Sequence, residues 1–231
     1  MMVRGSVSFA GGMPAALYPP LALRVTTPRL TLHGATDDLL AELLPTVRAG
    51  VVTPPEPFDD PMSLYEPNPR RERLWLQAIW RGRGMVRPDA WRLYFVVLWQ
   101  GRLVGMQDLI GVNFDTCRTV TSFSWLAPDV RGQGLGREMR AAILHLAFAG
   151  FGAAEAASDA LFDNAASNRI SAALGYQPNG TDWATRRGQP VLVQRWRLQR
   201  EAWARTRRDD IQLAGVEACR PVLFIEAPES T

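Results

Sequence analysis

The chain has 231 residues, of which 47% are hydrophobic and 21% charged, and its formal net charge is +3. This balance is typical of a globular protein, and no apolar run reaches the roughly 18 residues that a membrane-spanning helix needs. The first 18 residues lack a continuous apolar stretch, which argues against a signal peptide, and two cysteines are too few for a disulfide framework. We therefore expect a cytoplasmic protein.

Arginine supplies every one of the 26 basic residues. Surfaces that bind nucleic acid gather basic residues together with aromatic ones. The densest basic run here, residues 70–87, also contains glutamate and tryptophan, which is typical of an amphipathic helix. We expect no nucleic-acid partner and no membrane partner, and the oligomeric state is open between a monomer and a homodimer.

The first 20 residues are rich in glycine, proline and alanine and show no period, which predicts a flexible or draped N-terminal arm. Hydrophobic periodicity and cap residues then predict the elements of the first half of the chain. In chain order they are a strand at residues 30–32, a helix capped by Thr36 or Asp37, a proline-rich irregular loop at 51–69, a helix at 70–80, and a hairpin of strands at 91–99 and 103–110.

The second half of the chain alternates strands and helices. In chain order its pattern predicts a strand at residues 119–126, a glycine-rich turn at 131–136, a helix at 135–148, a strand at 153–161, a short helix ending at Gly175, a hairpin of strands at 181–185 and 191–198, a surface helix at 199–207 and a mostly extended tail at 211–225. Together the two halves predict a mixed α/β (α+β) protein with a central sheet of about seven strands.

The glycine-rich turn Arg131-Gly132-Gln133-Gly134-Leu135-Gly136-Arg137 lies between a strand and a helix. Glycines let backbone N–H groups converge on an anion, and the positive end of the helix dipole favours negative charge there. No Gly-Lys-Ser/Thr follows, so the turn is not a P-loop, and its spacing is not that of a dinucleotide fingerprint. The turn therefore predicts a phosphate site of another kind.

This turn resembles the Arg-x-x-Gly-x-Gly/Ala motif of the GNAT superfamily of acyl-CoA-dependent N-acyltransferases. Three more segments resemble its RimJ/RimL branch, the ribosomal-protein N-terminal acetyltransferases. They are Thr27-Pro28-Arg29-Leu30-Thr31-Leu32, Ser124-Trp125-Leu126-Ala127-Pro128, and Asp163-Asn164-Ala165-Ala166-Ser167 with Leu174-Gly175-Tyr176. The resemblance covers residues 27–198 and implies the GNAT fold, whose sheet splays between the fourth and fifth strands.

The resemblance also implies acetyl-CoA as cosubstrate, without a metal. The turn from Arg131 through Gly132, Gln133, Gly134, Leu135 and Gly136 to Arg137 would hold its pyrophosphate. Leu126 would present backbone groups to the pantetheine arm, and its N–H would polarise the thioester carbonyl. Asn164 would hydrogen-bond the coenzyme, with Ser167 as its partner, although an ordinary helix cap explains both residues equally well.

The catalytic positions depart from the family pattern. Where many relatives have a tyrosine that protonates the leaving thiolate, this chain has Ser171, which could assist the thiolate or be an ordinary helix serine. Where several relatives have a glutamate as general base, this chain has Thr121. We therefore take Asp108 as the candidate base, or Ser124 or Ser158 acting through water.

For the acceptor amine, the loop at residues 51–69 is the candidate wall of the site. Its carboxylates Glu56, Asp59 and Asp60 could attract a cationic substrate, or be solvated loop charges, and Trp125 could border the cleft. The acceptor we expect is a protein amine, at an N-terminus or a lysine. The alternatives are a small-molecule amine, such as an antibiotic or polyamine, and a non-catalytic acyl-CoA-binding module. In this organisation residues 1–26 form an arm, 27–198 the catalytic domain, and 199–231 a helix and tail packed on or beside it.

Overall fold

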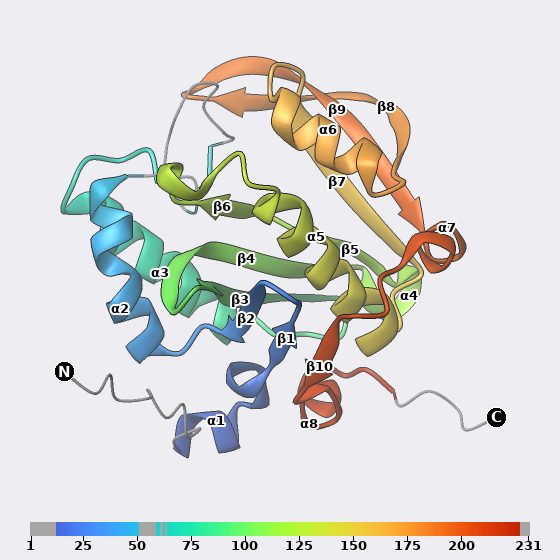
Figure 1. The fold of residues 1–231 in the computed structure, drawn as a ribbon, viewed down its shortest axis with the longest axis horizontal. Helices are drawn as coiled ribbons and strands as arrows, with labels where there is room; N and C mark the ends of the chain where they lie inside the picture. The colour runs from blue at the N-terminus through green and yellow to red at the C-terminus, as the bar shows by residue number, and fades with distance from the viewer. Residues whose placement is uncertain (1–12, 51–58, 61, 63, 227–231) are drawn as a thin grey trace.

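The computed structural model describes residues 13–50, 59, 60, 62 and 64–226. These residues form one mixed sheet with helices on both of its faces (Figure 1). The strands are β1 (Arg24–Thr26), β2 (Leu30–Gly34), β3 (Ala90–Trp99), β4 (Arg102–Val112), β5 (Thr119–Thr121), β6 (Ser124–Leu126), β7 (Glu155–Leu161), β8 (Gln177–Arg186), β9 (Gln189–Gln199) and β10 (Gln212–Ala214).

The helices are more numerous than the predicted ones, and α3 extends four residues beyond its predicted end. They are α1 (Met13–Leu17), the 3-10 turn η1 (Pro19–Ala22), α2 (Asp37–Ala49), α3 (Arg70–Gly84), α4 (Phe114–Cys117), the 3-10 turn η3 (Pro128–Val130), α5 (Leu135–His145), the π-helical turn η4 (Leu146–Gly150), α6 (Ala165–Ala173), α7 (Arg200–Thr206) and α8 (Val216–Val222). None of the helices in the described ranges is both long and apolar enough to span a membrane.

The order of the strands in the sheet is β10-β1-β2-β3-β4-β5-β7-β9-β8, and β6 pairs with β4 beside β5. Among the strands that the structure describes, only β5 and β7 run parallel, and the other pairs are antiparallel. The predicted mixed sheet is confirmed, with ten strands in place of about seven. The difference arises because β1 and β10 were not predicted and because residues 119–126 form two strands, β5 and β6.

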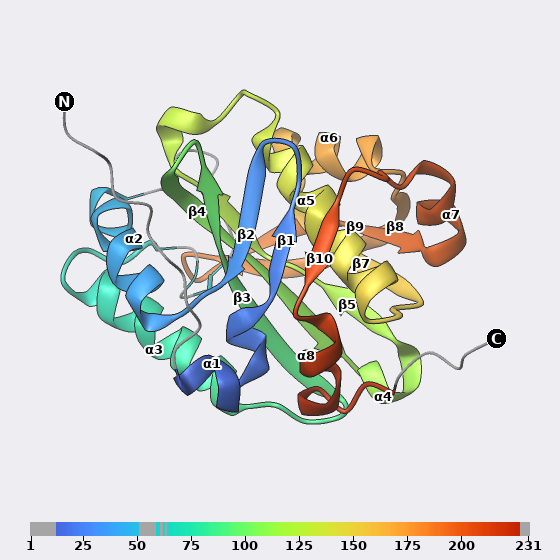
Figure 2. The ribbon, with the colours of Figure 1, turned by 60° about the horizontal axis from the view of Figure 1, so that its bottom comes forward.

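Both faces of the sheet are buried, because α2 and α3 cover one face and α5 with the C-terminal segment covers the other (Figure 2). Leu40 and Leu43 of α2 and Trp75 of α3 are fully buried on the first side. Phe148 and Phe95 are fully buried on the second. Since side chains alternate along a strand, β3 and β4 contribute to both layers and are therefore almost continuously hydrophobic.

The sheet splays where the resemblance places the opening. The parallel pairing of β5 with β7 comprises Thr119 opposite Glu155 and Val120 opposite Ala156. The chain then bends at residues 122 and 123, and β6 pairs with β4 alone. Among the described residues, no pair joins β6 to β7. The predicted gap between the fourth and fifth strands of the fold is thus present, and it lies beside Ser124–Leu126.

Two expectations about the ends of the domain were wrong. Residues 13–26 are not a featureless arm, because they contain α1, η1 and β1. The tail at residues 211–225 is not mostly extended, because β10 pairs with β1 and α8 follows it. Arg220 of α8 donates two hydrogen bonds to the carbonyl oxygen of Gly150, at 2.6 and 3.0 Å, and fixes this segment against the end of η4.

Candidate active site

The glycine-rich turn has the backbone that its sequence predicts. Gly132 and Gly134 have φ angles of +76° and +78°, a region that glycine adopts without steric cost. A Cβ atom at Gly132 would meet no other atom within 4 Å, so the outer side of the turn is open. Gly134 directly precedes α5, and the first N–H groups of a helix have no partner within it. The turn therefore offers open backbone donors at the positive end of a helix.

The third glycine of the turn differs from the first two, because its φ angle is not positive. Gly136 lies within α5, and a Cβ atom there would stand 3.5 Å from Cδ1 of Ile170 in α6. Arg137 donates a hydrogen bond of 3.4 Å to the carbonyl oxygen of Ala173, also in α6. A side chain at Gly136 would therefore only make an ordinary contact with α6, and the two helices border the same site.

Leu126 presents its backbone to the gap in the sheet. The N–H of Ala127 donates to the carbonyl oxygen of Val104 at 2.8 Å, and Leu126 faces Gly105 in register. Because hydrogen bonds alternate along an antiparallel pair, the N–H and C=O of Leu126 point away from β4, toward the unpaired side of β6. The C=O accepts a 2.9 Å hydrogen bond from Nε of Arg131, and the N–H remains directed into the gap.

On α6, three polar residues follow at helical spacing. Oδ1 of Asn164 accepts a 3.1 Å hydrogen bond from the N–H of Ser167, so Asn164 is a helix cap. One turn later, Ser171 is fully buried, and its hydroxyl has no partner among the described residues. Buried polar groups are normally hydrogen-bonded, so this unpartnered hydroxyl is unusual.

Asp108 is buried in β4 with 1% of its surface exposed. Its Oδ2 accepts a 2.7 Å hydrogen bond from Nε of Arg92 and forms an ion pair with Nη2 of the same residue at 2.6 Å. Its Oδ1 accepts a hydrogen bond from the N–H of Phe123 at the bend between β5 and β6. Burial raises the pKa of Asp108 to about 6, although Arg92 opposes the shift. A carboxylate with this pKa accepts protons near neutral pH, and it lies beside the residue that precedes Ser124.

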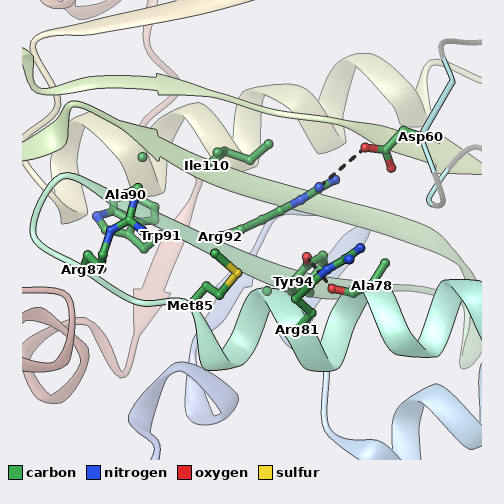
Figure 3. Close-up of a pocket in the computed structure, with 12 residues that line it drawn as sticks. Asp60, Ala78, Arg81, Met85, Arg87, Ala90, Trp91, Arg92, Tyr94 and Ile110 are labelled. Carbon is green, nitrogen blue, oxygen red and sulfur yellow. Dashed lines mark hydrogen bonds and ion pairs between the residues drawn. The ribbon is translucent and has the colours of Figure 1, made fainter.

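Arg92 also joins Asp108 to the acceptor loop, because its Nη1 lies 3.6 Å from Oδ2 of Asp60. Arg92 and Asp60 border a cavity of about 260 Å³ between α3 and strands β3 and β4. Figure 3 shows Arg92 extended toward Asp60, with Arg81 of α3 beside Tyr94. The described lining holds three arginines and one carboxylate (Arg81, Arg87, Arg92 and Asp60), so the described part of the lining carries a net positive charge.

The other loop carboxylates are placed differently. Asp59 accepts hydrogen bonds from the N–H groups of Arg187 and Gly188, at 2.6 and 3.0 Å, which hold its pKa below the usual value. It thereby ties the loop to the turn between β8 and β9. Glu56 lies outside the described residues. Trp125 is packed in the core under α2 and α3, and its indole N–H has no partner within the described part of the chain.

The sequence profile of the Acetyltransferase (GNAT) domain matches residues 29–177, which is well over half of the chain. The chain belongs to the GNAT family. It is therefore an acyltransferase, and GNAT acetyltransferases use acetyl-CoA. The match spans β2 to the start of β8 and includes the glycine-rich turn, the gap beside β6 and α6.

Solved GNAT structures share this fold at low sequence identity. RimL, a ribosomal L7/L12 alpha-N-protein acetyltransferase in complex with coenzyme A, has 16% identity over 75% of this chain and 95% of its own, with a TM-score of 0.57. SpeG, a spermidine/spermine N-acetyltransferase from Vibrio cholerae, has 18% identity over 77% and 98%, with a TM-score of 0.58. An N-acetyltransferase from Staphylococcus aureus has 13% identity over 74% and 98%, with a TM-score of 0.53.

Two charged residues of this GNAT domain were missed by the sequence reasoning. Arg92 is a single charge in the apolar strand β3, and a hairpin register counted from Gln100-Gly101 brings it near Asp108. Glu138 lies on the buried face of α5, where a carboxylate is unusual. In both cases a charged residue within an apolar pattern could have indicated a buried ion pair. The sequence alone did not show which distant residue was its partner.

Proposed function

We propose that this GNAT enzyme transfers the acetyl group of acetyl-CoA to a primary amine of a protein, at an N-terminus or a lysine, as RimJ/RimL enzymes do. The observation that carries the coenzyme assignment is the N–H of Leu126, directed into the gap beside β6 directly before the glycine-rich turn. A thioester carbonyl in this gap would accept that hydrogen bond, which stabilises the oxyanion that forms during transfer.

Residues around the gap would bind the phosphates, accept the proton of the amine and stabilise the leaving thiolate. Gly132, Gly134 and the start of α5 hold the phosphates, and Arg131 adds a positive charge. Asp108 receives the proton of the attacking amine, directly or through a water held by Ser124. The Ser171 hydroxyl stabilises the thiolate as the carbon–sulfur bond breaks, and the thiolate takes up a proton to leave as free coenzyme A.

The charge of the cavity favours a protein amine over a polyamine. A polyamine carries several positive charges and calls for a site rich in carboxylates, whereas the described lining holds three arginines and one aspartate. An α-amino group, with a pKa near 8, is also more readily neutral than a lysine amine near 10.4. We therefore rank the α-amino group first. Because the fold is also similar to that of SpeG, a spermidine/spermine N-acetyltransferase, a polyamine is the alternative acceptor.

The test is a turnover assay with acetyl-CoA and three matched acceptors, with mass spectrometry to locate the added group. The acceptors are a peptide with a free N-terminus and blocked lysines, the same peptide with a blocked N-terminus and one free lysine, and spermidine. We expect the highest kcat/KM for the free N-terminus. A kcat/KM for spermidine above those of both peptides would assign the enzyme to small-molecule acetylation.

A further inference from the structure

The turn between β1 and β2 contacts α5 directly (Figure 2). The buried carboxylate of Glu138 accepts three hydrogen bonds from this turn: one of 2.6 Å from the Thr27 hydroxyl, one of 3.1 Å from the N–H of Arg29, and one of 2.6 Å from Nε of Arg29. Burial alone would raise the pKa of Glu138, but these donors hold it below the usual value. Glu138 is thus a charged anchor for Arg29.

From this anchor, Arg29 reaches the glycine-rich turn. Its Nη1 donates a 3.0 Å hydrogen bond to the carbonyl oxygen of Gln133. Its Nη2 would lie 3.5 Å from a Cβ atom at Gly134. The guanidinium therefore bridges Glu138 and the peptide between Gln133 and Gly134.

The geometry of that peptide decides what Arg29 does. In a planar trans peptide, the C=O and the following N–H point in opposite directions. Because Arg29 holds the Gln133 carbonyl, the N–H of Gly134 is directed away from Arg29, to the opposite side of the peptide. Arg29 lies behind this donor, so it orients the donor and does not itself face the ligand that the donor meets.

We infer that Arg29, anchored by Glu138, is a positioning residue that fixes the Gly134 amide for binding the coenzyme phosphates. This inference rests on the proposed function, because it concerns the same coenzyme site. It gives a role to Thr27-Pro28-Arg29, a segment far from the glycine-rich turn in the sequence. The pair would raise coenzyme affinity by ordering the turn before binding, which lowers the entropy lost on binding.

The test measures the affinity for coenzyme A and for 3′-dephospho-coenzyme A by calorimetry. The variants are Arg29→Gln, Arg29→Lys, Glu138→Gln and the Arg29→Gln/Glu138→Gln double variant. Arg24→Gln, an exposed arginine on β1 of the same hairpin, is the control. We expect about tenfold weaker binding of both ligands in each single variant, no rescue by lysine, and little further loss in the double variant, because the pair acts as one unit.

Other outcomes overturn the inference. A loss confined to coenzyme A, rescued by lysine, would make Arg29 a direct contact to the 3′-phosphate. A lower melting temperature with unchanged affinity in Arg29→Gln would make the network structural only. If the wild-type protein binds neither ligand, the proposed function itself fails, whereas normal wild-type binding with unaffected variants rejects only the role of Arg29.

Discussion

Asp108 combines burial with a close cation, and the balance between the two determines when it can accept a proton. Burial disfavours the charged carboxylate, and Arg92 favours it, which leaves the pKa at about 6. Below that pH the carboxyl is protonated and cannot act as a base. Above it the carboxylate is ionised and competent.

For wild type we therefore expect kcat/KM, expressed per neutral amine, to rise as the pH increases through about 6 and then to level off. Arg92→Gln removes the charge that favours the ionised form, so the rise should move to higher pH. Asp108→Asn should lower kcat and abolish the rise. The measurement is a rate profile from about pH 5 to pH 8. A rise that persists in Asp108→Asn would show that another group is the base.

Ser171 is unusual because its hydroxyl is buried without a partner among the described residues. Ser171→Ala removes no hydrogen bond that the structure shows, so the melting temperature should stay within a few degrees of wild type. We expect kcat to fall by more than about threefold, which corresponds to roughly 0.6 kcal/mol, with unchanged affinity for coenzyme A. An unchanged kcat would make Ser171 a packing residue of α6.

Among the elements, the glycine-rich turn permits a test with an internal control. Gly132 and Gly180 have almost equal φ angles, +76° and +78°, and a Cβ atom at either would meet nothing within 4 Å. Gly132→Asp and Gly180→Asp therefore introduce the same strain and the same charge, one on the turn and one on β8.

We expect Gly132→Asp to raise the KM for acetyl-CoA by at least tenfold, because a carboxylate repels phosphate and its side chain occupies the open side of the turn. Gly180→Asp should leave that KM unchanged. Thermal unfolding should show a similar small loss of stability in both variants, of about 1 kcal/mol. Equal KM values in the two variants would remove the turn from the coenzyme site.

The sequence predicted the long elements well and the short ones poorly. Strands β3 and β4 are long, almost continuously apolar runs, and helix α3 has a periodic apolar face over fifteen residues. Strands β1 and β10 have three residues each, too few to show alternation, and they are defined by pairing: β10 pairs with β1, and β1 also pairs with β2. The position of β10 therefore depends on pairing with a strand distant in sequence, which a local sequence pattern cannot predict.

The same distinction holds within the site. The glycine-rich turn and the cap at Asn164 are local, so the sequence predicted their conformation. The ion pair of Arg92 with Asp108 and the anchor at Glu138 depend on residues brought together by the sheet. The roles of Arg92 and Glu138 could be assigned only once the structure showed which residues they contact.

At the scale of the whole molecule, segments on either side of the residues matched by the GNAT profile belong to the same sheet and core. The C-terminal segment buries Ile211, Val216, Leu223 and Ile225 against the core that contains α5. Full burial of such a side chain contributes about 1.5–3 kcal/mol. Four of them rival the total stability of a typical domain, about 5–15 kcal/mol. We propose that the folding unit includes β1 and extends through α8.

Deleting residues 211–231 should therefore abolish cooperative thermal unfolding and lower the yield of soluble protein. Deleting residues 227–231 alone is the matched control and should leave the melting temperature unchanged. Circular dichroism during heating measures both. A 211–231 deletion that unfolds at the wild-type temperature would show that the domain is complete without β10 and α8.

The pairing of β1 with β10 also constrains the order of events during synthesis. Arg24, Val25 and Thr26 pair with Ala214, Leu213 and Gln212, so β1 remains an open edge until translation has passed residue 214. Throughout that interval the nascent chain presents unpaired backbone groups that a neighbouring nascent chain can capture. We expect ribosome pausing before this point to increase aggregation, and a chaperone that shields the β1 edge to prevent it.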